Sequence, residues 1–131
     1  MKNIKDSQIS QRFMIRRRLR SGGMWEVYEA HDRERNGVVA LKVFSLTDRA
    51  EVGSLQKAFR AIAEISHPNI VSLYDFECAD TSCFITSELV EGMTFIDYVR
   101  PAHQLSGIGG TLDESRLRSV WRQLAQAVEA L

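Results

Sequence analysis

The stretch VVALKVFS, residues 38–45, is rich in β-branched and apolar residues and predicts a buried strand. Successive side chains of a strand point to opposite faces, so Ala40 and Lys42 share one face. The strand before it can present Val27 to that same face. An apolar surface beside a lysine suits a flat aromatic ring that carries a polyphosphate.

Two further strands are predicted upstream of this stretch. Residues 13–19, FMIRRRL, predict a half-buried strand. Its two-residue period places Phe13, Ile15 and Leu19 on one face with Arg17, and Met14, Arg16 and Arg18 on the other. A turn at residues 21–24, SGGM, leads into a second strand at residues 25–31, WEVYEAH. Asn36-Gly37 closes the polar connection to the third strand, because this dipeptide favours a tight hairpin. The three strands are therefore expected to be consecutive and antiparallel.

Downstream of this stretch the sequence changes to helical periodicity and then returns to strands. Apolar residues recur at helical spacing over residues 50–66, and Pro68 is expected to end that helix. The predicted elements that follow are strands at 69–78 and 83–90, a short helix at 95–100, and a long helix that Thr111 caps through a box with Glu114. The fold class is α+β: a five-stranded antiparallel sheet with one helix after its third strand, followed by two helices.

Composition narrows the classes of function. The 131 residues carry 17 basic and 17 acidic side chains, so no net field attracts nucleic acid, and we expect no nucleic-acid partner. The arginines in 13–19 are interpreted as the solvated face of an edge strand. No apolar run is long enough for a membrane span, and the N-terminal residues do not resemble a signal peptide. A cytoplasmic location without a membrane partner is therefore expected.

The cysteines and histidines give no catalytic or metal signature. Cys78 and Cys83 flank a predicted hairpin tip and could face each other. Two cysteines without a nearby histidine form neither a zinc set nor a disulfide framework, so reduced thiols serving as small apolar fillers are expected. His31 and His67 lie beside no evident nucleophile and are interpreted as structural.

Four motifs in order resemble those of the Hanks-type serine/threonine protein kinases, including their bacterial members. They are a glycine-rich loop at 19–27, VALK at 39–42, HPNIVSLYDF at 67–76, and the hinge SELVEG at 87–92. The resemblance covers residues 12–131. It implies an N-terminal tail at 1–11, a small lobe at 12–90, and the hinge end with the first helices of a truncated large lobe at 91–131.

The resemblance implies an ATP site on the small lobe. Leu19, Val27 and Ala40 would cover the adenine, and the Glu88 carbonyl and Val90 amide would hydrogen-bond its edge. These positions all match the family pattern. Adenine nucleotide is thus the expected ligand.

Further roles follow from the same resemblance. Lys42 would hold the α- and β-phosphates, and Gly22 and Gly23 belong to the loop that approaches them. Ser87 occupies the gatekeeper position beside the hinge, and its alternative role is a strand serine satisfied by the backbone. The implied cofactor is ATP, bound weakly. Mg²⁺ is not expected, because its family ligands lie in the part of the large lobe that is absent from these residues.

Three departures from the family pattern bear on activity. Arg20 and Trp25 replace two of the three loop glycines, and the indole stands where backbone should approach phosphate. Ala58 occupies the position of the helix glutamate that pairs with the lysine, while Glu51 and Glu64 lie too far away along or around the helix. The family's catalytic base and metal ligands follow the last helix and do not occur here.

Two interpretations therefore remain open. The first is the ATP-binding lobe of a serine/threonine kinase, truncated before its catalytic loop and unable to transfer phosphate alone. The second is a pseudokinase-like binding or regulatory module with weak or no nucleotide binding. The last helix carries an apolar stripe, and this helix is expected to fold back, to associate with a protein partner or a second copy, or to be disordered. The stripe comprises Leu117, Trp121, Leu124, Val128 and Leu131.

Overall fold

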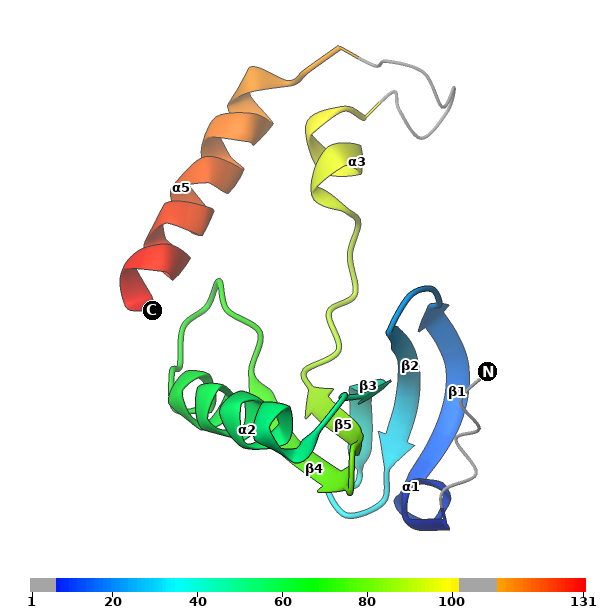
Figure 1. The fold of residues 1–131 in the computed structure, drawn as a ribbon. Coiled ribbons are helices and arrows are strands. Elements are labelled where there is room, and N and C mark those ends of the chain that lie inside the picture. The colour runs from blue at the N-terminus through cyan, green and yellow to red at the C-terminus, as the bar shows by residue number, and fades with distance from the viewer. Residues whose placement is uncertain (1–6, 102–110) are drawn as a thin grey trace. The chain divides into compact units, whose positions relative to one another are not determined.

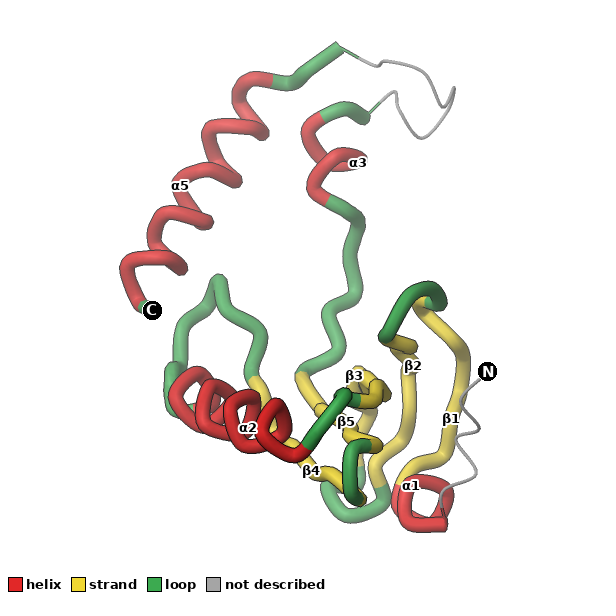
Figure 2. The backbone as a smooth tube through the Cα atoms, viewed as in Figure 1, coloured by secondary structure: helices red, strands yellow, loops and turns green. Residues whose placement is uncertain are grey.

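The fold is taken from a computed structural model that describes residues 7–101 and 111–131 (Figure 1). Its elements in chain order are α1 (Ser7–Arg12), β1 (Phe13–Arg20), β2 (Trp25–Asp32), β3 (Gly37–Ser45), α2 (Arg49–Ala63), β4 (Leu73–Ala79), β5 (Ser82–Ser87), α3 (Phe95–Val99) and α5 (Glu114–Ala130). Figure 2 traces the same path, with helices red and strands yellow. The predicted α+β class, with five antiparallel strands and a helix after the third, is confirmed.

The strands form one antiparallel sheet in the order β1-β2-β3-β5-β4. Tight connections fix its register. Asn36 adopts a φ of 52° at the end of the β2–β3 connection, and Asp32 pairs with Gly37, so residues 33–36 form the connection rather than a two-residue Asn-Gly turn. Asp80 adopts a φ of 58° at the tip between β4 and β5. Asn and Asp tolerate this left-handed region better than other residues with a side chain.

One face of the sheet forms the hydrophobic core. Alternate residues of β2, β3 and β5 point to it, and Leu41 and Ala30 are completely buried there. Full burial of a leucine side chain contributes about 1.5–3 kcal/mol. Burial, with the hydrogen bond that Tyr28 donates to Glu26, raises the pKa of Tyr28 to about 12. The core cluster comprises Ile9, Phe13, Tyr28, Ala30, Val39, Leu41, Val43 and Phe84.

The first strand differs from its prediction. The alternation in residues 13–19 predicted a half-buried strand, but Phe13 is its only buried residue. The pairing of β1 with β2 shifts register between Ile15 and Arg17 and again between Arg18 and Arg20. Such irregularities break the two-residue alternation of a strand, and an edge strand has a neighbour on one side only. The arginines are therefore exposed, as expected.

An ion cluster around Arg12 connects α1, β2 and β4 and was not predicted. Its guanidinium donates to both carboxylate oxygens of Asp32 at 2.9 and 2.7 Å, and to Asp75 at 2.6 Å. Burial alone would raise the pKa of Asp32, but hydrogen bonds from Arg12 and from backbone amides outweigh it and lower that pKa. Helix α1 includes residues 7–11 of the expected N-terminal tail and places Ile9 in the core.

Two helix boundaries differ from the predictions. The helix predicted over 50–66 ends at Ala63, three residues earlier than predicted. The Glu64 amide bonds to the Ile62 carbonyl, which tightens the last turn. The long helix is capped by Asp113 rather than by Thr111, because the Asp113 side chain accepts the Arg116 amide at 3.0 Å.

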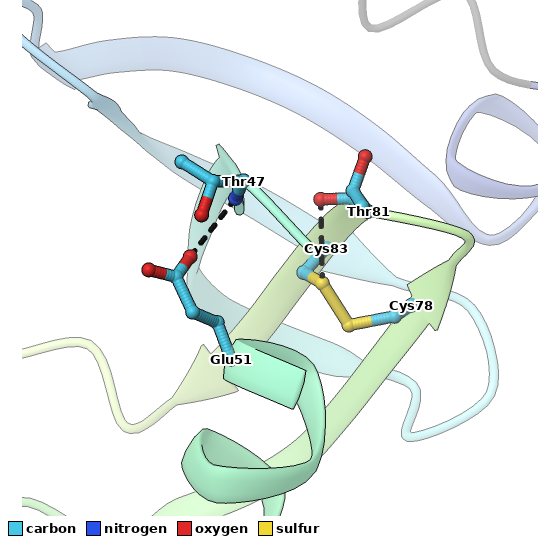
Figure 3. The surroundings of a disulfide bond; sticks show 5 residues. All are labelled: Thr47, Glu51, Cys78, Thr81 and Cys83. Atoms are coloured by element: carbon cyan, nitrogen blue, oxygen red, sulfur yellow. Dashed lines mark hydrogen bonds between the residues drawn. A yellow bond between two sulfur atoms is a disulfide. The ribbon is translucent and has the colours of Figure 1, made fainter. Parts of the chain in front are cut away.

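The two cysteines are joined, so the prediction of reduced thiols is wrong (Figure 3). The pairing of β4 with β5 places Cys78 directly opposite Cys83, with a Cα–Cα separation of 4.1 Å. Spacing alone left the two side chains free to face each other or not. The register of the hairpin, which is set by its tip, brings the two sulfur atoms together.

The described residues divide into two units. One contains the sheet and α2, up to Ser66 and again over Val71–Val90; the other contains His67–Ile70 and the residues from Glu91. In the second unit the Asp113 amide donates to the Val99 carbonyl at 2.8 Å, which joins α3 to the start of α5. His67 accepts the Asn69 amide at its Nδ1, which supports its structural role.

Candidate nucleotide site

The residues around Lys42 gather on the sheet face opposite the core. Lys42 pairs with Val27 of β2 on one side and with Ile85 of β5 on the other. Ala40 pairs with Ser87 of β5. Cross-strand partners point to the same face, and Ala40 and Lys42 are two residues apart in β3. The predicted grouping of Val27, Ala40 and Lys42 on one face is therefore present.

The glycine pair forms the turn between β1 and β2. Gly22 has a φ of 134° and Gly23 a φ of 67°, and a Cβ built at either position meets no atom within 4 Å. Glycine is therefore needed here for backbone conformation rather than for lack of room. Leu19, the residue expected above an adenine, is 40% exposed on β1 just before this turn.

The hinge leaves β5 through Glu88. The Glu88 amide donates to the Ser72 carbonyl at 2.9 Å, and the Glu88 carboxylate accepts the Ser72 amide at 3.2 Å. The Ser87 hydroxyl donates to the Glu88 carbonyl at 3.2 Å, so this serine is satisfied by backbone. The Glu88 carbonyl oxygen has a second lone pair and can accept another hydrogen bond. Val90 is 63% exposed, and its amide makes no hydrogen bond to any residue that the structure describes.

The ammonium of Lys42 faces an aromatic ring. Its Nζ lies 4.5 Å from the centre of the Trp25 ring, and the described part of the chain offers it no ion pair. On α2, Ala58 is exposed and carries no carboxylate. The Glu51 carboxylate accepts the Thr47 amide at 2.9 Å at the start of that helix (Figure 3). Glu64 forms its C-cap.

Two residues beside this site were not assigned a role from the sequence. Ile85 lies next to Lys42 through the pairing of β3 with β5. The sequence could have indicated this, because Ile85 is two residues before Ser87 in the same strand and therefore shares its face. Trp25 was treated only as an obstacle in the loop. Its contact with Lys42 depends on the register between β2 and β3, which spacing along the chain does not give.

The described ranges, 7–101 and 111–131, contain neither a candidate metal site nor a candidate membrane-spanning helix. No group of three or more histidine, cysteine, aspartate or glutamate side chains there could hold a metal ion. No helix there is long and apolar enough to cross a membrane.

The five-stranded sheet, the helix after its third strand and the hinge define the class of a protein kinase small lobe. The protein kinase domain family matches residues 13–131. The chain therefore belongs to the protein kinase family, with Hanks-type serine/threonine kinases as its relatives.

Three curated relatives illustrate the match. The chain is 30% identical to serine/threonine-protein kinase PrkC from Bacillus subtilis, over 92% of this chain and 18% of that protein. It is 29% identical to serine/threonine-protein kinase PknE from Mycobacterium tuberculosis, over 90% of this chain and 20% of that protein. It is 30% identical to serine/threonine-protein kinase tousled-like 2 from Mus musculus, over 94% and 17%. The chain thus spans about a fifth of each relative's length.

Proposed function

We propose that the chain is the adenine-nucleotide-binding lobe of a serine/threonine protein kinase. Residues 12–90 form the small lobe and residues 91–131 the beginning of the large lobe. The adenine lies against Leu19, Val27 and Ala40, and its edge bonds to the hinge at Glu88 and Val90. The phosphates reach Lys42, beside the turn that contains the glycine pair.

The observation that carries this proposal is the grouping of Ala40, Val27 and Lys42 on one face, beside a hinge whose Val90 amide has no partner among the described residues. An apolar surface with a few convergent polar groups is typical of a ligand site. The exposed Val90 amide supplies a donor for a base edge, and the Glu88 carbonyl supplies an acceptor. Lys42 supplies the positive charge that phosphates require.

Binding can be tested with ATP, ADP, adenosine and GTP by isothermal titration and thermal shift. A ligand that binds only the native state must raise the melting temperature. We expect millimolar ATP to raise it without Mg²⁺, and Lys42→Met to reduce the rise. Lys57→Met is the matched control, because Lys57 is an exposed lysine on α2. No shift with any adenine ligand would refute the proposal.

Phosphoryl transfer by this chain alone is not expected. The 131 residues contain no His-Arg-Asp and no Asp-Phe-Gly motif, which supply the base and metal ligands in this family. Transfer of radiolabelled phosphate to a protein substrate by the purified chain, absent in Lys42→Met, would contradict this expectation.

A second candidate is a pseudokinase-like regulatory module, favoured by the indole of Trp25 and by the lack of a carboxylate partner for Lys42. The last helix supports a role in association. Trp121 is 57% exposed, and Leu124 and Val128 are also exposed on α5. We propose that this stripe contacts a protein partner or a second copy. Sedimentation velocity should then show concentration-dependent association that Leu124→Glu abolishes, and a monomer at all concentrations would exclude self-association.

A further inference from the structure

The side chain of Trp25 lies where Lys42 can reach it because of the strand register. Trp25 pairs with Phe44, and Val27 pairs with Lys42, so Trp25 and Lys42 are diagonal neighbours on one face. Diagonal neighbours in an antiparallel pair are within reach when one side chain is aromatic and the other long. The 4.5 Å between Nζ and the ring centre is well inside the range of a cation–π contact.

A series of aromatic rings, of which Phe44 is buried, packs beside the indole. The Trp25 ring lies 5.3 Å from Phe44, which is 3% exposed. Phe44 stacks on Phe76 at 6.4 Å, and Phe76 meets Phe59 of α2 at 5.7 Å. The contact between α2 and this face is therefore apolar. Trp25 itself is 45% exposed, and its ring contacts both Phe44 and the Lys42 ammonium.

Other anions that could hold Lys42 are already bound elsewhere. On β2, Glu29 shares the face of Val27 and accepts from Arg17, whereas Glu26 lies on the opposite face, where it accepts the Tyr28 hydroxyl at 2.7 Å. On α2, Glu51 is bound to the Thr47 amide. An ammonium has three N–H donors, so one side can face the indole while the others remain available to phosphate.

We propose that Trp25 is the positioning residue of Lys42, in place of a carboxylate on α2. The indole holds the ammonium over the sheet face, where a nucleotide's phosphates can accept its remaining N–H groups. The orientation of Lys42 then depends on the β1–β2 hairpin and not on an ion pair with α2. The role toward phosphate rests on the proposed function, whereas the contact itself does not.

The contact is tested without ligand by NMR on the full chain labelled at lysine Cε. The sequence has four lysines, and Lys42→Arg assigns the signal of interest. The ring should move the Lys42 signal upfield of that of exposed Lys57. Trp25→Leu should abolish this displacement, and Trp25→Phe should retain part of it. Trp121→Leu is the control and should leave Lys42 unchanged. A Lys42 signal that coincides with that of Lys57, or that is unaffected by Trp25→Leu, would overturn the proposal.

The positioning role is tested by comparing the affinities for ATP and adenosine. Trp25→Leu should lower the preference for ATP by about two- to fivefold, the value of an exposed cation–π contact, and Trp25→Phe should recover part of it. If both ligands bind and the preference is unchanged in Trp25→Leu, the positioning role is refuted while the proposed function stands. If neither ligand binds the unsubstituted chain, the proposed function fails and the positioning role fails with it; the spectra then decide the contact alone.

Discussion

Replacing Arg12 by methionine should destabilise the sheet unit more than any exposed charge substitution. The Arg12 side chain is 10% exposed and that of Asp32 is fully buried. Methionine keeps much of the length of the side chain but removes the donors to Asp32 and Asp75. Four carboxylates lie within ion-pair distance of Arg12, those of Asp32, Glu34, Asp75 and Glu77.

The expected loss follows from the buried carboxylate left behind. Removing one partner of a buried ion pair costs about 3–5 kcal/mol, because the remaining charge has no compensation. Arg12→Met should lose this amount near neutral pH. Part of the loss should return in Arg12→Met/Asp32→Asn, since the buried charge is then absent and coupled residues are not additive.

The assay is urea unfolding followed by Trp25 fluorescence in a Trp121→Phe background, so that the signal reports the sheet unit alone. Arg17→Met is the control. Arg17 pairs with Glu29 from a side chain that is 65% exposed, and such a pair contributes at most about 1 kcal/mol. If Arg12→Met costs no more than the Arg17 control, the reasoning about the buried cluster is refuted.

Three further predictions follow from single features of the structure. The pKa of Asp32 in the folded chain lies below its usual value of 3.8, so its contribution to stability is present above that pH and is lost as pH falls through the folded pKa. In a pH series of thermal melts, the melting temperature should therefore fall below about pH 4, and Asp32→Asn should flatten this decline. Intact mass with and without reduction and alkylation should show the Cys78–Cys83 bond, and reduction should cost about 2 kcal/mol for so short a loop; immediate alkylation of both thiols without reductant would contradict it. In matched urea melts, Gly53→Ala should stabilise α2 by about 0.5–1 kcal/mol, because an added Cβ there has no atom within 4 Å. Gly23→Ala should lower the free energy of unfolding by about 1–2 kcal/mol, because Gly23 has a positive φ; equal effects of the two changes would refute the conformational argument.

Much of the site was predictable because its signals are local. The two-residue period of a strand predicted that Ala40 and Lys42 lie on one face of the sheet, and the strand pairing confirms this. Asn36 marked the β2–β3 turn through a backbone conformation that few residues adopt. The order of the four kinase motifs led to the family that residues 13–131 match. The nucleotide-binding roles themselves remain proposals.

The sequence by itself determined the order of the five strands and of the helices that follow the third strand, the face that carries Lys42, and the family. Only the tertiary structure decided the partners of particular side chains: Cys78 with Cys83, Arg12 with Asp32, and Lys42 with the ring at position 25. Periodicity and turn preferences act between residues a few positions apart. Partners in these contacts come from different elements of the chain, so they meet only once the register imposed by the turns has arranged the whole sheet.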